Sequence, residues 1–140
     1  MKGFDKIVRY LLDDRQNTYS KILKIYKTKE EEKDARGVIQ YIDSLYRLHL
    51  RARINVETAQ IVGPELQHQI NIQENNLEFM NIALKELLSA ENASKVMNLY
   101  KHLSQRDVEL HKVRNLSYFK RLKMAKQIRR EMKSAESMSK

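Results

Sequence analysis

The stretch FDKIVRYLLDDRQNTYSKILKIY, residues 4–26, decides the fold class of this chain. Apolar side chains recur in it every three or four residues, which places them on one side of an α-helix. They are Phe4, Ile7, Val8, Leu11, Leu12, Tyr19, Ile22, Leu23 and Tyr26. The polar run 13–17 lies mostly on the opposite face, so the pattern favours one continuous amphipathic helix over two helices broken there.

The rest of the chain shares this pattern and contains few residues that make turns. It has three glycines and one proline, whereas sandwiches, barrels and parallel α/β folds need a turn signal at each strand end. The hydrophobic fraction of 41% is enough for a packed core. We therefore predict an all-α fold. We expect an elongated antiparallel bundle of four to five long helices with a basic C-terminal helix that can protrude.

Local signals place the remaining helices. Thr28-Lys29-Glu30-Glu31 matches a capping box and predicts a second helix that starts near residue 29 and ends near Val62. Gly63-Pro64 stops that helix and starts a third, whose amide-rich stretch 67–76 is either solvated or part of an interface. Ser89 is the expected cap of a further helix. The pattern leaves open whether residues 90–133 form one helix or two, with an interruption near Ser104.

Charge divides the chain into two unequal parts. Residues 1–110 hold 17 Lys or Arg and 16 Asp or Glu, whereas residues 111–140 hold 10 bases and only two acids. We predict a near-neutral helical bundle at 1–110, a basic helix at 111–133 packed on it or extending from it, and a frayed tail at 134–140. Positive charge segregated in this way indicates an anionic partner.

The basic segment is the main candidate for a functional site. The predicted nucleic-acid contacts in it are Lys112, Arg114, Lys120, Arg121, Lys123, Lys126, Arg129, Arg130 and Lys133. On a helix, the seven bases from Lys120 to Lys133 cover a broad arc and leave a thin apolar seam through which the helix can dock. The seam consists of Leu122, Ala125, Ile128 and Met132. A merely solvated helix end is the simpler alternative, because cations near a helix C-terminus also favour the helix dipole.

Two further groups could extend this surface. Tyr118 and Phe119 come just before the main basic run and could stack on the bases of a single strand. Arg47, Arg51 and Arg53 form a second basic patch in the predicted second helix, where Arg47 and Arg51 share a face. Pairing with acids elsewhere in the bundle is an equally good interpretation of this patch.

The sequence has no pattern typical of an enzyme. It contains no cysteine, no Gly-rich phosphate loop, no nucleophile elbow and no zinc-binding His-Glu-x-x-His motif. Glu65 and His68 have the Glu-x-x-His spacing of di-iron bundles, but the required second copy is missing. We therefore expect no catalytic residue, metal, cofactor or small-molecule substrate. Without a signal peptide or a stretch of ~20 apolar residues, we expect a cytoplasmic (intracellular) protein with no membrane span.

Two functions remain after these exclusions. The favoured hypothesis is a non-enzymatic nucleic-acid-binding protein that contacts the phosphates of DNA or RNA with little sequence specificity. The rival is a protein-interaction or assembly subunit, such as a component of a larger complex, a virion or a homo-oligomer, whose basic helix docks on an acidic partner. Binding to a membrane surface ranks last, because the bases are too scattered around the helix to leave one strong apolar face.

Overall fold

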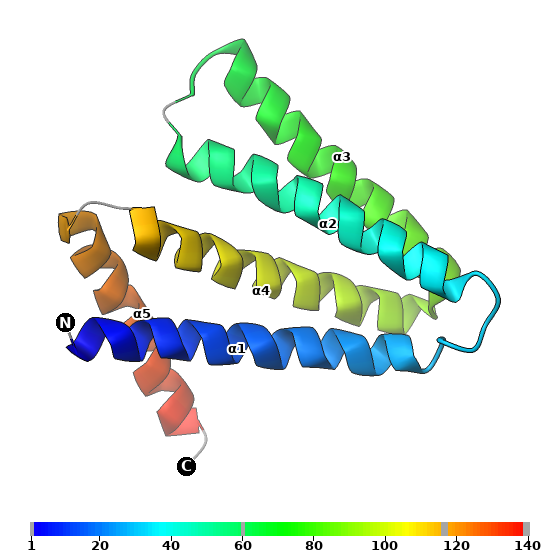
Figure 1. Ribbon diagram of the computed structural model, residues 1–140, viewed down its shortest axis with the longest axis horizontal. Coiled ribbons are helices and arrows are strands. Elements are labelled where there is room, and N and C mark those ends of the chain that lie inside the picture. Colours follow the sequence, from blue (N-terminus) through cyan, green and yellow to red (C-terminus); the bar gives the residue numbers. More distant parts are fainter. Residues whose placement is uncertain (1, 60, 116–117, 139–140) are drawn as a thin grey trace.

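The computed structural model describes residues 2–59, 61–115 and 118–138, without the side chains of residues 2, 118–120, 137 and 138. These ranges fold into five α-helices and contain no strand, which confirms the all-α prediction (Figure 1). The helices are α1 (Lys2–Lys27), α2 (Ala35–Thr58), α3 (Pro64–Leu87), α4 (Ala90–Asn115) and α5 (Tyr118–Met138). None of the helices in these ranges is long and apolar enough to cross a membrane.

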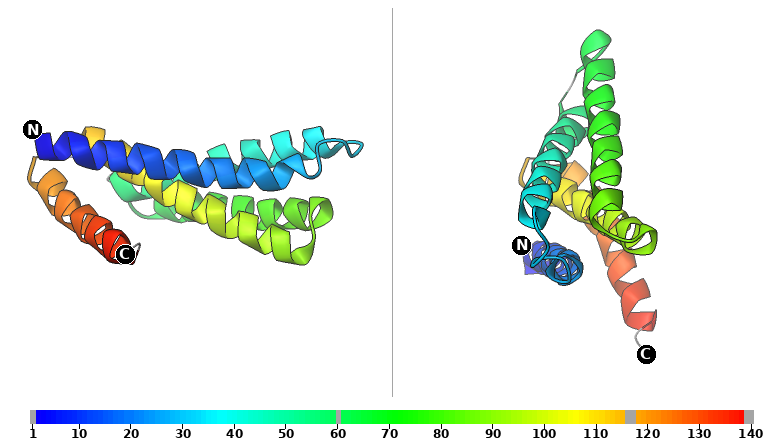
Figure 2. Two further views of the ribbon diagram at one scale, coloured as in Figure 1. Left: turned by 90° about the horizontal axis from the view of Figure 1, so that it is seen from below. Right: turned by 90° about the vertical axis from the view of Figure 1, so that its right-hand side faces the viewer.

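The helices form an elongated antiparallel bundle built from two pairs. α1 runs antiparallel to α4, α2 runs antiparallel to α3, and α4 contacts both helices of the second pair (Figure 1). The α2–α3 pair slants away from α4 toward the turn at Gly63 that joins its helices. α5 crosses the end of the bundle at which α1 begins, and its C-terminal end points away from α2 and α3 (Figure 2). The predicted bundle with a protruding basic helix is therefore confirmed.

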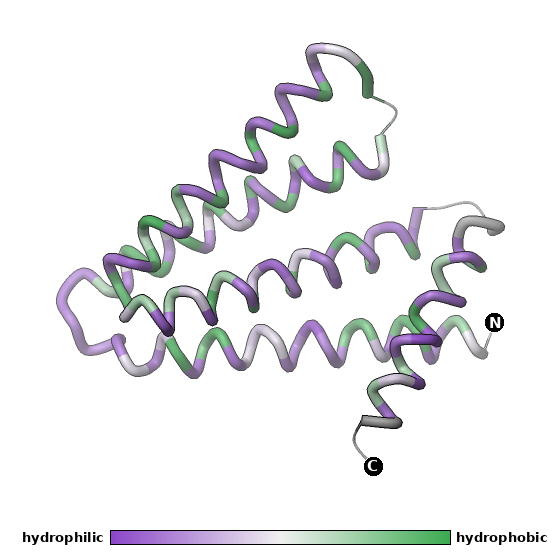
Figure 3. The backbone as a smooth tube through the Cα atoms, turned by 180° about the vertical axis from the view of Figure 1, so that it is seen from behind, coloured by the Kyte–Doolittle hydropathy of each residue, from purple (hydrophilic) through white to green (hydrophobic). Residues whose placement is uncertain are grey.

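The larger apolar core lies where the second half of α1 meets α2, α3 and α4. The apolar positions of each helix turn toward it, so hydrophobic and hydrophilic residues alternate along each helix in Figure 3. Its fully buried side chains include Ile22, Ile42, Met80, Leu84 and Val96. The hydroxyls of Tyr26 and Tyr100 lie 2.7 Å apart, and Tyr100 donates to Asp43 at 3.1 Å. These bonds satisfy hydroxyls whose burial without a partner would be costly.

A second, smaller apolar cluster holds α5 on the other helices. It consists of the first half of α1, the end of α4 and one face of α5. Its buried members are Ile7, Leu11, Leu110, Val113, Ala125 and Ile128. Because α1 and α4 run through both clusters, they fix the position of α5 relative to α2 and α3.

The second helix starts later and ends earlier than predicted. α2 begins at Ala35, because the Thr28 hydroxyl donates to the carbonyl of Ile25 at 2.7 Å and closes α1 instead of capping a new helix. Residues 28–34 form turns, and Asp34 has a left-handed φ of 67° immediately before α2. At the other end α2 stops at Thr58, because the backbone of the next residue is extended. The capping-box prediction was therefore wrong.

Other local predictions are confirmed. α1 continues without a break through residues 13–17. Pro64 begins α3, and Gly63 before it has a φ of 64°, a conformation that glycine adopts without steric cost. The Ser89 hydroxyl accepts the backbone N–H of Asn92 at 3.2 Å, as expected of a cap at the start of α4.

The amide-rich stretch of α3 is solvated on one side and contacts α2 on the other. On the solvated side, the Gln67 amide donates to Asn71 at 2.9 Å. On the inner side, Asn55 of α2 donates to Gln69 at 3.4 Å. One face of this stretch is therefore exposed and the other packs inside the bundle, and a role in an interface with another chain stays a prediction.

The C-terminal part of the chain consists of two helices. α4 continues through Ser104, whose buried hydroxyl accepts a hydrogen bond from Arg53 at 3.0 Å. The boundary expected at residue 110 falls inside α4, because Leu110 and Val113 continue its buried stripe. α5 runs to Met138, so residues 134–138, which were expected to belong to a tail, are helical.

Candidate nucleic-acid interface

α5 docks on the body through an apolar seam that differs slightly from the predicted one. Ala125 and Ile128 are buried and Met132 is half-buried, as expected. Leu122 is exposed instead, and Met124 takes its place against the cluster. The cause is helical geometry: positions 124, 125, 128 and 132 share one face, and position 122 lies about 100° from the centre of that face at ~100° per residue.

Four cations form a stripe on the side of α5 opposite the seam. The four cations are Lys123, Lys126, Arg130 and Lys133. Their spacings of three, four and three residues place them on one side of the helix. All four are exposed, and none forms an ion pair or hydrogen bond within the part of the chain that the structure describes. The stripe is about 15 Å long at ~1.5 Å per residue. We refer to these four residues as the outward stripe.

Arg121, a predicted contact, points into the protein. Its Nη2 donates to the backbone carbonyl of Arg114 at 3.1 Å, and its guanidinium carbon lies 5.9 Å from the centroid of the Phe4 ring. Its Nε is buried and has no hydrogen-bond partner among the described residues. Because carbonyls at a helix C-terminus carry partial negative charge, Arg121 stabilises the end of α4.

Two other predicted contacts, Lys112 and Arg53, share one acid within the bundle. Arg53 donates to Glu57 at 2.9 Å, and the Nζ of Lys112 lies 3.6 Å from the same carboxylate. Arg53 also donates to Ser104 at 3.0 Å and to Gln105, so it fastens α2 to α4. For Arg53, the structure thus shows the pairing within the bundle that was the alternative interpretation of its patch.

The remaining predicted contacts lie in several places. Arg47 and Arg51 are exposed on α2, whereas the cluster that holds α5 contains residues of α1, α4 and α5, so the two arginines lie apart from the outward stripe. Arg114 is exposed at the end of α4. The side chains of three predicted contacts lie outside the described residues: Tyr118, Phe119 and Lys120.

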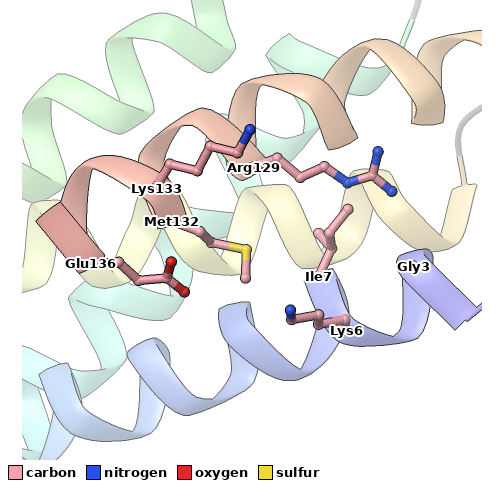
Figure 4. A pocket seen from close by; sticks show the side chains of 7 residues that line it. All are labelled: Gly3, Lys6, Ile7, Arg129, Met132, Lys133 and Glu136. Carbon is pink, nitrogen blue, oxygen red and sulfur yellow. The ribbon is translucent and has the colours of Figure 1, made fainter.

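Arg129 faces α1, and this brings an unpredicted cation, Lys6, to the basic surface. A pocket of about 230 Å³ lies between the first turns of α1 and the last turns of α5 (Figure 4). Its lining consists of Gly3, Lys6, Ile7, Arg129, Met132, Lys133 and Glu136. Gly3 permits the close approach, because a Cβ there would lie 2.7 Å from Nη2 of Arg129. Lys6 was not among the predicted contacts, since it is at the opposite end of the chain. We call this cavity the α1–α5 pocket.

A buried ion network behind the seam was also not predicted. Arg106 is only 5% exposed, and its three nitrogens bind three acids. Nε donates to Asp14 at 2.6 Å, Nη1 to Glu109 at 3.1 Å and Nη2 to Glu131 at 2.9 Å. The guanidinium carbon lies 5.4 Å from the centroid of the Tyr10 ring. One side chain therefore joins α1, α4 and α5 through charge-assisted hydrogen bonds.

Burial and hydrogen bonding act in opposite directions on the pKa values of this network. Burial alone would lower the pKa of Arg106, but its bonds to Asp14 and Glu131 raise it overall. Partial burial would raise the pKa of Asp14, but hydrogen bonds from Arg106 and His102 lower it overall. At Glu109, burial outweighs the attraction of Arg106 and raises the pKa. The network therefore favours the ionised form of Asp14, whose pKa is lowered, but not that of Glu109, whose pKa is raised.

The sequence contains one signal for this network. Arg106 and Glu109 stand among the residues Leu103, Leu110 and Val113, which form the inner face of α4. A charged side chain on an inner face needs a partner, because burying an unpaired charge is costly. Spacing along the chain does not reveal that the partners are Asp14 and Glu131, which lie on other helices.

The described residues contain no candidate metal site, and the chain has no match among the known proteins compared with it. Among the described residues, no group of three or more His, Cys, Asp or Glu side chains could hold a metal ion. Comparison with protein-family models, with curated proteins and with solved structures found no match for this chain.

Proposed function

We propose that this chain is a non-enzymatic nucleic-acid-binding protein that contacts the phosphates of DNA or RNA through α5. The observation that supports this best is the outward stripe, whose four exposed cations share one face and have no acidic partner among the described residues. A linear array of cations suits a nucleic-acid backbone, because that backbone presents negative charges at short regular intervals. A function of this kind would place the protein inside the cell.

The way α5 is attached also supports the proposal. The apolar seam and the bond between Arg106 and Glu131 hold the helix on the body, so the stripe stands on a docked helix. Binding through a preorganised element loses less conformational entropy. With about four phosphates neutralised, the logarithm of the affinity for duplex DNA should fall with the logarithm of the salt concentration with a slope near −4. We expect little sequence specificity, because phosphate contacts carry no base information.

The test is a fluorescence-anisotropy titration of labelled duplex DNA, single-stranded DNA and RNA at two salt concentrations. Replacing all four stripe residues with Glu should weaken binding at least ~100-fold through loss of the phosphate contacts. A matched control replaces four exposed bases on the body with Glu and changes the net charge equally. Its positions are Lys21, Lys33, Arg36 and Lys101.

The control variant should keep most of the affinity, and both variants should keep the helix content of the parent in circular dichroism. An equal loss in the two variants would attribute binding to net charge alone. Binding that survives in the stripe variant would contradict the assignment to α5.

A second function, assembly with another protein, is supported by a different surface. Tyr41, Leu48, Phe79 and Ile82 are each 46–50% exposed on the α2–α3 pair. One groove of about 450 Å³ is lined by Val38, Tyr41, Phe79 and Ile82. Leu48 lies two turns beyond Tyr41 on the same face of α2. Exposed apolar side chains that gather on one face mark interaction surfaces, whereas scattered ones are ordinary.

Size-exclusion chromatography with light scattering tests whether this surface pairs copies of the chain. Self-association would give a mass that is a multiple of 16.7 kDa, and a Phe79→Ser/Ile82→Ser variant should return the mass to that of the monomer. Lys21→Ser/Lys101→Ser, on exposed positions elsewhere, serves as the control. A mass of 16.7 kDa at every concentration would contradict self-association.

A further inference from the structure

Three cations border the α1–α5 pocket. Lys6 extends from α1, and Arg129 and Lys133 extend from α5 (Figure 4). None of the three forms an ion pair or hydrogen bond within the described part of the chain. Like charges held around one pocket repel one another, so an anion bound between them would be stabilised by all three.

The floor of the pocket is apolar. Ile7 is 1% exposed, and the half-buried Met132 lies between the two helices. The volume of about 230 Å³ is below the ~300–1,000 Å³ of pockets that enclose drug-sized ligands, so the pocket can hold a phosphate and part of the group attached to it, with the remainder outside. Glu136 adds a carboxylate to the same lining, which favours a single phosphate over a polyphosphate. The cations therefore suit one phosphate group, and the small apolar floor suits a sugar or base attached to that phosphate.

We propose that the α1–α5 pocket binds one nucleoside monophosphate unit. Arg129 and Lys6 hold its phosphate, and the sugar or base covers Ile7 and Met132. This inference rests on the proposed function, because the unit can be one nucleotide of a bound strand. Lys133 belongs to both the pocket and the outward stripe, so a strand can continue from the pocket along α5. A free nucleotide has the same chemistry and is the other possible source.

Gly3 offers a variant that changes the pocket without changing charge. In Gly3→Ala, the new Cβ would lie 2.7 Å from Nη2 of Arg129, which is too close, so the flexible guanidinium would have to move. Alanine is a better helix former than glycine, so the start of α1 is not weakened. We expect the affinity for a mononucleotide to fall about tenfold, the effect of losing one charge-assisted hydrogen bond. Gly37→Ala, at a position with open space around it, is the matched control.

The experiment follows the methyl signals of methionine by NMR in the full chain labelled with [¹³C-methyl]methionine. The signal of Met132 is assigned with Met132→Leu, and those of Met80 and Met97 in the larger core serve as internal references. The probes are adenosine 5′-monophosphate, adenosine, inorganic phosphate and a short single-stranded oligonucleotide. We expect the monophosphate and the oligonucleotide to shift the Met132 signal, adenosine to leave it in place, and Gly3→Ala to weaken both responses.

The possible outcomes separate this inference from the proposed function. Oligonucleotide binding together with a Met132 signal that neither the oligonucleotide nor the monophosphate moves would overturn the pocket and leave the proposed function intact. A response to the monophosphate without any oligonucleotide binding would support the pocket and overturn the proposed function. An equal response to inorganic phosphate would reduce the pocket to a simple anion site and overturn the inference. An unmoved Met132 signal with every probe, together with no oligonucleotide binding by anisotropy, would overturn both.

Discussion

The two ends of the bundle are held by different interactions, although α1 and α4 run through both. At the end shared with α2 and α3, the core is large and apolar, and the buried hydroxyls of Tyr26 and Tyr100 bond to each other within it. At the end shared with α5, a smaller apolar cluster lies beside the charged network of Arg106. Packing should therefore supply more of the stability of the first end, and charge more of that of the second.

Apolar contacts and charged hydrogen bonds contribute differently to the fold. Apolar burial is non-directional, so it gives stability without defining one angle between helices. A guanidinium is a planar fork of donors, so Arg106 can satisfy Asp14, Glu109 and Glu131 in few arrangements. We expect the network to fix the angle at which α5 crosses α1 and α4, and with it the direction of the outward stripe.

The largest effect is expected from a cavity in the apolar end. Leu84 is fully buried in the larger core, so Leu84→Ala should lower the free energy of unfolding by about 3–5 kcal/mol. The loss should be the same at low and high salt, because no charge is involved. Urea unfolding followed by circular dichroism measures it. A salt-dependent loss would break the proposed contrast between the two ends.

A slightly smaller and more local effect is expected from Arg106→Met. The change keeps an apolar side chain of similar reach but leaves three acids without their cation, which should cost about 3 kcal/mol. Hydrogen exchange should show lower protection in α5 and little change in α2 and α3. Leu84→Ala should do the reverse and lower protection in α2 and α3. Unchanged exchange in α5 would mean that the apolar seam alone holds this helix.

A double variant separates charge from packing at the same site. Glu109 is 7% exposed, so it is the acid that suffers most when Arg106 is removed. In Arg106→Met/Glu109→Leu that buried charge is gone, and part of the lost stability should return. Asp14 and Glu131 are more exposed and can be solvated in both variants. A double variant no more stable than Arg106→Met would show that packing causes the loss.

The helices and their inner faces could be predicted because each helix carries an apolar stripe. Such a stripe can be recognised in the local sequence without knowing which helix packs against it. The start of α2 could not, because a capping box is a local pattern and the Thr28 hydroxyl had a second acceptor, the carbonyl of Ile25. Both arrangements satisfy a hydroxyl within a few residues. The local sequence alone therefore does not decide between them.

The sequence predicts that the candidate site lies in a basic segment. It does not predict which cations of that segment face solvent. The sequence treats Arg121 and Lys123 alike, yet one contacts the Arg114 carbonyl and the other belongs to the outward stripe. Which cations turn inward depends on how α5 docks, and that depends on residues far away in the chain. Lys6 and Arg106 were missed for the same reason: Lys6 lies beside residues of α5, and Arg106 binds acids of α1 and α5.

Two acids of the network should respond to pH with opposite sign. The pKa of Asp14 is lower in the fold than its usual value of 3.8, so its contribution is present above that value and is lost as the pH falls through the folded pKa. The pKa of Glu109 is raised above its usual value of 4.5, mainly by burial. Its contribution is therefore present below that value and is lost as the pH rises through the folded pKa.

The smallest effect is expected from Asp14→Asn, and it distinguishes the two ends by pH alone. Asparagine keeps the shape of the side chain but does not titrate, so stability should fall less steeply below about pH 5 than in the parent chain. Urea unfolding at a series of pH values measures the slope, and hydrogen exchange assigns it to α5 or to α2 and α3. A slope equal to that of the parent would place the acid sensitivity on other carboxyl groups. The charged end of the bundle would then be no more sensitive to acid than the apolar end, and the contrast would rest on packing alone.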